Sequence, residues 1–133
     1  AGTFGYELDI TKIPEEERKQ IPDQVAMYHK YNDLVREGDY YRILSFRENN
    51  RDDSYMVVSK DKKEALVTFV QVMHMTSVPN LPVKLEGLDP DTMYRIDEID
   101  MTLSGSVLMN AGLPVKLEHG DYKAGLYYLK AVE

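Results

Sequence analysis

The chain has 133 residues, of which 43% are hydrophobic and 29% are charged, and its formal net charge is −7. This length and composition are typical of one globular domain with a core of its own. The negative charge argues against a nucleic-acid partner, because phosphate binding requires a basic surface. Cysteine is absent, which excludes disulfides, thiol catalysis and cysteine-ligated zinc.

The start of the chain and its hydropathy give expectations about its origin. No secretory leader opens the sequence, and no apolar run reaches the length of a membrane span. Together with the absence of cysteine, this favours a cytoplasmic protein. The first residue is Ala1 rather than Met, so we expect a processed form or an excised piece of a longer protein.

Residues 4–10 alternate between apolar and polar side chains. This period of two predicts a half-buried β-strand. The carboxylates of Glu7 and Asp9 would share its polar face. No turn and no second strand follow directly, so the strand has no partner close by in the sequence. The apolar positions are Phe4, Tyr6, Leu8 and Ile10.

Residues 14–36 predict the one long helix of the chain. Pro14 suits the first helical position, and the three glutamates after it favour the positive end of the helix dipole. Pro22 lies inside the pattern, so we expect a kink or a restart there, and Gly38 suits the end of the helix. The apolar face is formed by Ile21, Val25, Tyr28 and Val35, and is widened by Met27, Tyr31 and Leu34.

After Gly38 the period changes to that of strands. The polar turns between the candidates favour an antiparallel arrangement, so we expect a mainly β fold in which residues 39–133 form an antiparallel β-sandwich. The candidate strands are residues 39–46, 54–60, 64–75, 83–88, 92–99, 99–103 and 122–132. The expected core residues are Ile43, Leu44, Val57, Val67, Phe69, Leu85, Ile96, Leu126 and Leu129.

The three histidines share no metal-binding motif. His29 lies on the helix, His119 lies in a turn, and His74 lies in a strand between Met73 and Met75. No two histidines have a spacing such as H-x-x-x-H, and the two methionines would point to the face opposite His74. We therefore predict no metal and no cofactor, and interpret the methionines as core or interface residues.

The 23 acidic residues reveal no catalytic pair. Such a pair requires two carboxylates that converge in a pocket, whereas these lie mostly in turns. The nucleophile elbow, the P-loop and the dinucleotide-binding glycine motif are all absent. We therefore predict no catalytic, cofactor-binding or metal-binding residue in this chain.

Tyrosine is abundant, with ten residues that include the doublets Tyr40-Tyr41 and Tyr127-Tyr128. Exposed aromatic rings stack on sugar rings, so one interpretation is a self-standing carbohydrate-binding sandwich that uses surface tyrosines. A doublet also places one ring on each face of a strand, as a strand between two layers requires. We favour packing and keep sugar binding as the alternative.

Several segments resemble, in the same order, the C-terminal end of bacterial α-galactosidases of glycoside hydrolase family 36. The resemblance covers essentially the whole chain, and its most specific pieces are FGYELD and LMNAGL. The other pieces are GDYYRILSF, MVVSKDKKEALV, VKLEGLDPDTMYRID, SGSVLMNAGLP and GDYKAGLYYLK. The family commonly carries an acidic pair before LMN, where this chain has Ser106-Val107, so no role of that pair is transferred.

The resemblance implies a division of the chain. Residues 1–38 would be the last strand and helix of a catalytic (β/α)₈ barrel, and residues 39–133 would be the C-terminal sandwich. The partners of the first strand would then belong to the barrel, near whose catalytic end Glu7 and Asp9 would lie. Without the barrel, we expect copies of the chain to self-associate through residues 1–38.

The resemblance also implies an activity for the parent protein. The family hydrolyses terminal α-galactosides such as melibiose and raffinose with retention of configuration, using two aspartates in barrel motifs. Neither motif occurs in this chain, so no catalytic residue is transferred to it. We expect a non-catalytic portion that packs on the barrel and stabilises it.

Overall fold

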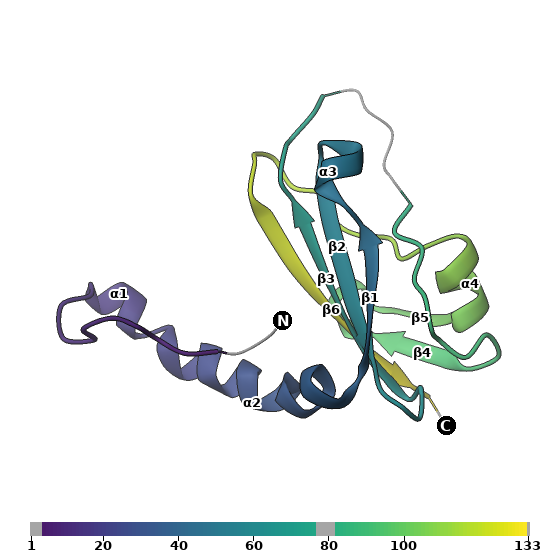
Figure 1. The fold of residues 1–133 in the computed structure, drawn as a ribbon, viewed down its shortest axis with the longest axis horizontal. Helices are drawn as coiled ribbons and strands as arrows, with labels where there is room; N and C mark the ends of the chain where they lie inside the picture. The colour runs from purple at the N-terminus through teal and green to yellow at the C-terminus, as the bar shows by residue number, and fades with distance from the viewer. Residues whose placement is uncertain (1–3, 77–81, 133) are drawn as a thin grey trace.

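The computed structural model describes residues 4–76 and 82–132 (Figure 1). A single long helix near the N-terminus precedes a group of antiparallel strands, so the expected mainly β class is confirmed. No helix within these residues is long and apolar enough to cross a membrane. The elements are α1 (Glu15–Arg18), α2 (Ile21–Glu37), β1 (Asp39–Leu44), α3 (Phe46–Asn49), β2 (Asp52–Val58), β3 (Glu64–Gln71), β4 (Met93–Ile96), the 3₁₀-helix η1 (Asp97–Ile99), β5 (Met101–Ser104), α4 (Gly105–Asn110) and β6 (Lys123–Ala131).

The six described strands form one antiparallel sheet in the order β1-β2-β3-β6-β4-β5. The expected β2–β3 hairpin is confirmed, with a register that runs from Asp52 opposite Gln71 to Val58 opposite Ala65. Strand β6 follows β5 in the sequence but does not pair with it. In the sheet, β6 lies between β3 and β4. The centre of the sheet is therefore built from segments that are far apart in the chain.

Residues 83–88 do not form the strand that their alternation predicts. The segment makes only an isolated bridge, between Val83 and Leu113. The Leu85 N–H donates to the Leu108 carbonyl of α4 at 3.0 Å, so a helix end takes the place of a neighbouring strand. The alternating apolar side chains of this segment are buried in the core, but the segment itself is extended chain and not a strand of the sheet.

The core lies against one face of the sheet, which we call the inner face. Side chains of β2, β3, β4 and β6 pack there against residues 83–88, α4 and residues 113–115. Figure 1 shows α4 beside the strands. The second layer thus consists of loops and a short helix. Of the predicted core residues, those buried on the inner face are Val67, Phe69, Leu85, Ile96 and Leu129. Val57 is also buried, but it lies on the opposite face of β2, where it is paired with Leu66.

The other predicted core residues are less buried. Ile43 and Leu44 are partly buried and pack against the core from the edge strand β1. Leu126 is half-buried and lines a groove under α2 on the opposite face, which we call the outer face. Leu126 is therefore a correction to the predicted core, because its place in the β6 alternation turns it away from the inner face.

The expected strand at residues 4–10 is also a correction, because no strand forms there. All of these residues are exposed, and within the described chain no other strand runs beside them. A strand needs a neighbour to satisfy its backbone N–H and C=O groups. Without one, the segment instead lies along α2, where the Phe4 ring stacks on the Tyr28 ring at 5.2 Å.

The helical region is divided as its proline predicts. One turn, α1, ends at Arg18, and α2 restarts at Ile21 with Pro22 in its first turn. The chain passes from α2 into β1 through Gly38, whose φ of −73° is not left-handed. Figure 1 shows α1 and the start of α2 extending away from the sheet, while the C-terminal part of α2 lies close to it.

Candidate functional site: a groove between helix α2 and the sheet

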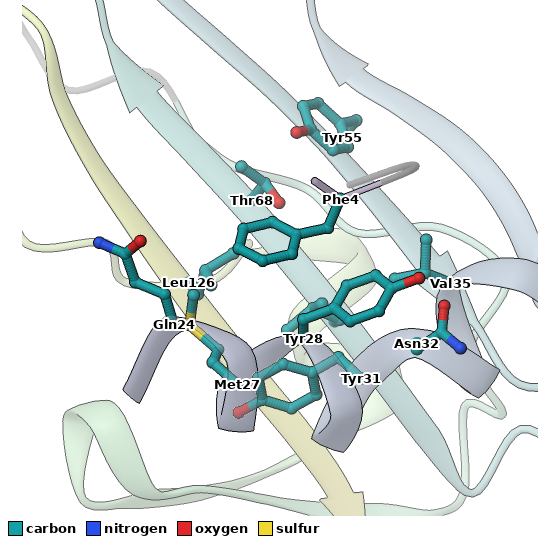
Figure 2. A pocket seen from close by; sticks show the side chains of 11 residues that line it. Phe4, Gln24, Met27, Tyr28, Tyr31, Asn32, Val35, Tyr55, Thr68 and Leu126 are labelled. Carbon is teal, nitrogen blue, oxygen red and sulfur yellow. The ribbon is translucent and has the colours of Figure 1, made fainter. Parts of the chain in front are cut away.

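A groove with a volume of about 450 Å³ separates α2 from the outer face of the sheet. Figure 2 shows aromatic rings from the helix and from the N-terminal segment gathered over the strands. The lining comes from this segment, from α2 and from strands β2, β3 and β6. It consists of Phe4, Gln24, Met27, Tyr28, Tyr31, Asn32, Val35, Tyr55, Leu66, Thr68 and Leu126.

The helix wall of the groove is the apolar face that the sequence predicts for α2. Positions three and four apart share one side of a helix, and Tyr28, Tyr31 and Val35 follow that spacing. Part of this wall remains open, since the Met27 side chain is 44% exposed. The sheet covers only a portion of the apolar face of α2.

Aromatic contacts attach the N-terminal segment to α2. The Phe4 ring stacks on Tyr28 and makes an edge contact with Tyr6, whose centroid is 5.1 Å away. The Tyr6 hydroxyl donates a hydrogen bond to the Gln24 side-chain oxygen. Even so, the rings of Phe4 and Tyr6 are each 37% exposed.

A second cluster attaches α2 to the sheet. The Tyr31 and Tyr128 rings lie 5.3 Å apart, and the Lys30 ammonium lies 4.9 Å and 5.1 Å from their respective centroids. These distances suit cation–π attraction. Burial, followed by the neighbouring Glu64 carboxylate, raises the pKa of Tyr128. This phenol therefore stays neutral and serves packing.

The tyrosine doublets place their rings on different sides of their strands. Tyr127 is buried against the core, and its hydroxyl accepts a hydrogen bond from the Lys116 N–H at 3.0 Å. Tyr128 faces α2 on the opposite side. In the other doublet Tyr41 packs against the core, whereas Tyr40 is 56% exposed. The Tyr40 ring nevertheless stacks on the Tyr55 ring with a centroid distance of 5.8 Å, so all four rings of the doublets make packing contacts.

The lining of the groove contains no acid–base pair. Its lining contains amides, hydroxyls, a thioether and apolar groups, but no carboxylate, imidazole or amine. The titratable groups of the lining are the phenols of Tyr28, Tyr31 and Tyr55, and the lining offers no second kind of titratable group to complete an acid–base pair with them. The arrangement is suited to receiving an apolar surface and not to cleaving a bond.

The carboxylates of the N-terminal segment lie outside the groove. Asp9 accepts hydrogen bonds from the Thr11 hydroxyl at 2.6 Å and the Thr11 N–H at 3.1 Å, and it pairs with Lys12 at 3.2 Å. These contacts, led by the hydroxyl, lower the pKa of Asp9. A catalytic acid requires the opposite shift. Glu7 is exposed.

Two carboxylates that the sequence places in a turn lie at the start of β2 instead, where they form ion pairs with arginines. Asp52 is buried and lies 2.6 Å from Arg51, while the more exposed Asp53 lies 2.7 Å from Arg42. Within residues 4–76 and 82–132, no three histidine, aspartate or glutamate side chains gather as they would to enclose a metal ion.

The histidines are arranged in a way that the sequence did not predict. His29 lies on α2 with its ring 5.7 Å from that of Tyr28. The rings of His74 and His119, which come from distant parts of the chain, lie 5.3 Å apart. Sequence spacing cannot reveal this pair, because the fold of the sheet brings the two segments together.

Two family models match the chain. The model described as the glycosyl hydrolase family 36 C-terminal domain matches residues 52–129, which contain most of the sheet. The chain belongs to this family. A second model, described as melibiase, matches residues 1–38, which include the N-terminal segment and α2.

Named relatives extend the family assignment along the whole chain. Alpha-galactosidase Mel36A of Lactobacillus acidophilus is 39% identical over 98% of this chain. Alpha-galactosidase AgaA of Geobacillus stearothermophilus is 38% identical over 100% of it. The chain spans only 18% of the length of each of these relatives.

Solved structures of family 36 enzymes share the fold. The crystal structure of AgaA from Geobacillus stearothermophilus is similar with a TM-score of 0.88 at 39% identity. The galactosidase domain of the alpha-galactosidase-sucrose kinase AgaSK gives a TM-score of 0.87 at 33% identity. Each match covers 97% of this chain and 18% of the solved one. The chain thus corresponds to the C-terminal part of larger family 36 enzymes.

Proposed function

We propose that this chain is the non-catalytic C-terminal portion of a retaining α-galactosidase, which it stabilises by packing against the catalytic barrel. The observation that carries the proposal is the extent of the matches. Relatives named alpha-galactosidases align with nearly the whole chain, yet the chain spans 18% of their length. Most of such an enzyme would therefore lie outside these residues.

The parent enzyme would hydrolyse terminal α-galactosides such as melibiose and raffinose. In support, one solved AgaA variant is in complex with raffinose and another is in complex with stachyose. These ligands belong to those relatives, and the substrate of the parent of this chain is a proposal by analogy.

The surface that would meet the barrel is formed by residues 1–38, as their match to the melibiase model supports. Apolar side chains on this part of the chain remain exposed, among them Leu8 at 49%, Ile10 at 45% and Met27 at 44%. Several large apolar side chains left exposed on one segment are typical of an interaction site. In the parent enzyme, the preceding polypeptide would cover the groove and these side chains.

The proposal can be tested by splitting a relative. AgaA of Geobacillus stearothermophilus would be produced without the region that matches this chain, and the 133-residue chain would be added to it. We expect the shortened enzyme to lose activity rapidly on warming, and the added chain to prolong its hydrolysis of p-nitrophenyl-α-galactoside. No effect of the chain at saturating concentration would contradict the proposed packing.

Two methionines provide a matched pair of variants for this test. Met27 lines the groove and is 44% exposed, and Met101 is 41% exposed on the edge strand β5 at the far side of the sheet. Met27→Asp should abolish the protection because it places a charge in an apolar contact. Met101→Asp should leave the protection intact, and equal losses would point to general destabilisation instead.

The alternative function is a self-standing carbohydrate-binding module. The observation that favours it is the exposure of Tyr40 at 56% and Tyr122 at 78%. The two rings belong to opposite ends of the sheet, because Tyr40 is opposite Val57 whereas Tyr122 precedes the start of β6. We expect galactose and raffinose to show no saturable binding in calorimetric titrations. Binding that Tyr40→Ala abolishes would support the alternative.

The same surface suggests how the chain behaves without a barrel. We infer that isolated copies associate through residues 1–38, since one copy can cover the apolar side chains that another exposes. The contact would replace the missing part of the enzyme and would not be a physiological dimer.

A further inference from the structure

His74 and His119 form a side-chain pair that the proposed function does not use. Their ring centroids are 5.3 Å apart, and the ring planes are inclined by 55°. Both residues are exposed, so the pair is open to solvent. His74 follows β3, and His119 lies in the turn that precedes β6.

Hydrogen bonds hold the two histidine-bearing segments together. The Gln71 side-chain amide donates to the carbonyls of Glu118 and Gly120, both at 2.7 Å. The Asp121 carboxylate accepts from the His74 backbone N–H at 2.6 Å. Gln71 is buried, with 4% of its surface exposed. The imidazoles are therefore positioned by contacts that do not depend on their own rings.

The spacing of the rings matches that of two imidazoles on one metal ion. A Zn–N bond is about 2.0–2.1 Å long and a ring centroid lies about 1 Å behind its nitrogen, so two rings on a tetrahedral ion have centroids about 5 Å apart.

We propose that His74 and His119 form a surface binding site for a divalent transition-metal ion of the zinc, nickel and copper class. Imidazole is a preferred ligand of these ions. The carboxylate of Asp121, which lies on the same turn, favours a cation over an anion at this place. Two protein ligands leave the other coordination positions to water, so the affinity would be modest.

A bound ion would cross-link two parts of the fold. One ligand follows β3 and the other precedes β6, and these two strands are neighbours in the sheet. A ligand that binds only the folded state stabilises it by mass action. The site would thus fasten the end of the sheet that is remote from the β2–β3 turn. This inference does not rest on the proposed function.

The test is calorimetric titration of Zn²⁺ into the full 133-residue chain, prepared without a histidine tag. We expect one ion per chain and a rise of the thermal unfolding midpoint with Zn²⁺ concentration. Mg²⁺, which prefers oxygen ligands, should produce neither effect. Absence of a binding heat with Zn²⁺ would overturn the proposal.

The third histidine supplies the matched control. His74→Gln and His119→Gln should each weaken Zn²⁺ binding at least tenfold, because a single imidazole remains. His29→Gln, on the exposed surface of α2, should leave the affinity unchanged. Unaltered affinity in either of the first two variants, or an equal loss in the third, would overturn the site. Far-ultraviolet circular dichroism checks that all three variants remain folded.

Discussion

Phe69 contributes a large aromatic side chain to the core from the middle of β3, and only 3% of it is exposed. We expect Phe69→Ala to lower the free energy of unfolding by about 3–5 kcal/mol, because it leaves a cavity that the neighbours fill incompletely. Urea denaturation measures this change. Phe4→Ala, at a ring that is 37% exposed, should have a smaller effect. A loss below about 1 kcal/mol at Phe69 would contradict its burial.

Tyr94 links two turns from within the core. It is fully buried, its hydroxyl donates to the Lys62 carbonyl at 2.7 Å, and the Asp89 N–H donates to it at 3.1 Å. Burial is the main cause that raises the pKa of Tyr94. The folded chain therefore retains this proton at a pH where the unfolded chain, with a tyrosine pKa of about 10, releases it.

A pH dependence follows from this shift. The stabilisation from Tyr94 is complete below about pH 10 and is lost as pH rises toward the folded-state pKa. We expect Tyr94→Phe to flatten the decline of the free energy of unfolding above pH 10, measured by urea denaturation at successive pH values. Tyr122→Phe, at a ring that is 78% exposed, should leave the slope unchanged. An identical slope in all three proteins would rule out a contribution from Tyr94.

At the scale of elements, the junction between α2 and β1 depends on a glycine for lack of space. A Cβ atom at Gly38 would lie 2.4 Å from Val57 Cγ1 and 2.7 Å from the carbonyl oxygens of Leu34 and Val58. Those two oxygens are backbone atoms that a side-chain rotation cannot move. The glycine is thus required by close packing and not by a left-handed conformation.

We therefore expect Gly38→Ala to destabilise the chain by about 1–3 kcal/mol, as overpacked substitutions do. Gly5→Ala is the matched control, because a Cβ atom there would meet nothing within 4 Å. Thermal unfolding followed by circular dichroism measures both. A Gly38→Ala chain as stable as the Gly5→Ala chain would show that the junction can shift without cost.

Local patterns predicted the elements whose partners are close in the sequence. The β2–β3 hairpin follows from alternation on both sides of a charged turn, and the restart of α2 follows from Pro22. Residues 4–10 and 83–88 have the same alternation, but neither has a neighbouring strand in the described chain. A period of two indicates which side chains share a face, and only long-range pairing decides whether a strand forms.

The candidate sites likewise contain parts that local spacing predicts and parts that only long-range pairing creates. One wall of the groove could be predicted, because apolar residues three and four positions apart in the sequence share one face of α2. The other wall depends on Tyr55, Thr68 and Leu126, which the register brings side by side from three strands. The His74–His119 pair could not be predicted, since no local spacing relates two segments that meet only when β3 pairs with β6.

At the scale of the whole molecule, we expect the isolated chain to have no α-galactosidase activity. Retaining hydrolysis needs two carboxylates about 5–5.5 Å apart across the bond that breaks, and the groove contains none. The measurement is release of p-nitrophenol from p-nitrophenyl-α-galactoside, with AgaA as a positive control. Turnover above a protein-free blank by a homogeneous preparation would contradict this expectation.

We also expect the isolated chain to self-associate, since Leu8, Ile10 and Met27 are left exposed on residues 1–38. Light scattering over a range of concentrations should show a mass above 15.3 kDa that rises with concentration. A shortened chain that begins at Gly38 should stay monomeric. A monomeric full chain at high concentration, or equal association of both chains, would contradict the inference.

The position of β6 has a consequence for how the protein is made in the cell. This strand lies between β3 and β4, and it forms ladders with both. While the ribosome is still synthesising residues 123–131, the hairpin formed by β2 and β3 has already emerged with an unpaired edge. The two halves of the sheet can join only after β6 has left the exit tunnel. During that interval the nascent chain is vulnerable to wrong strand pairing, and a chaperone that shields the β3 edge would protect it.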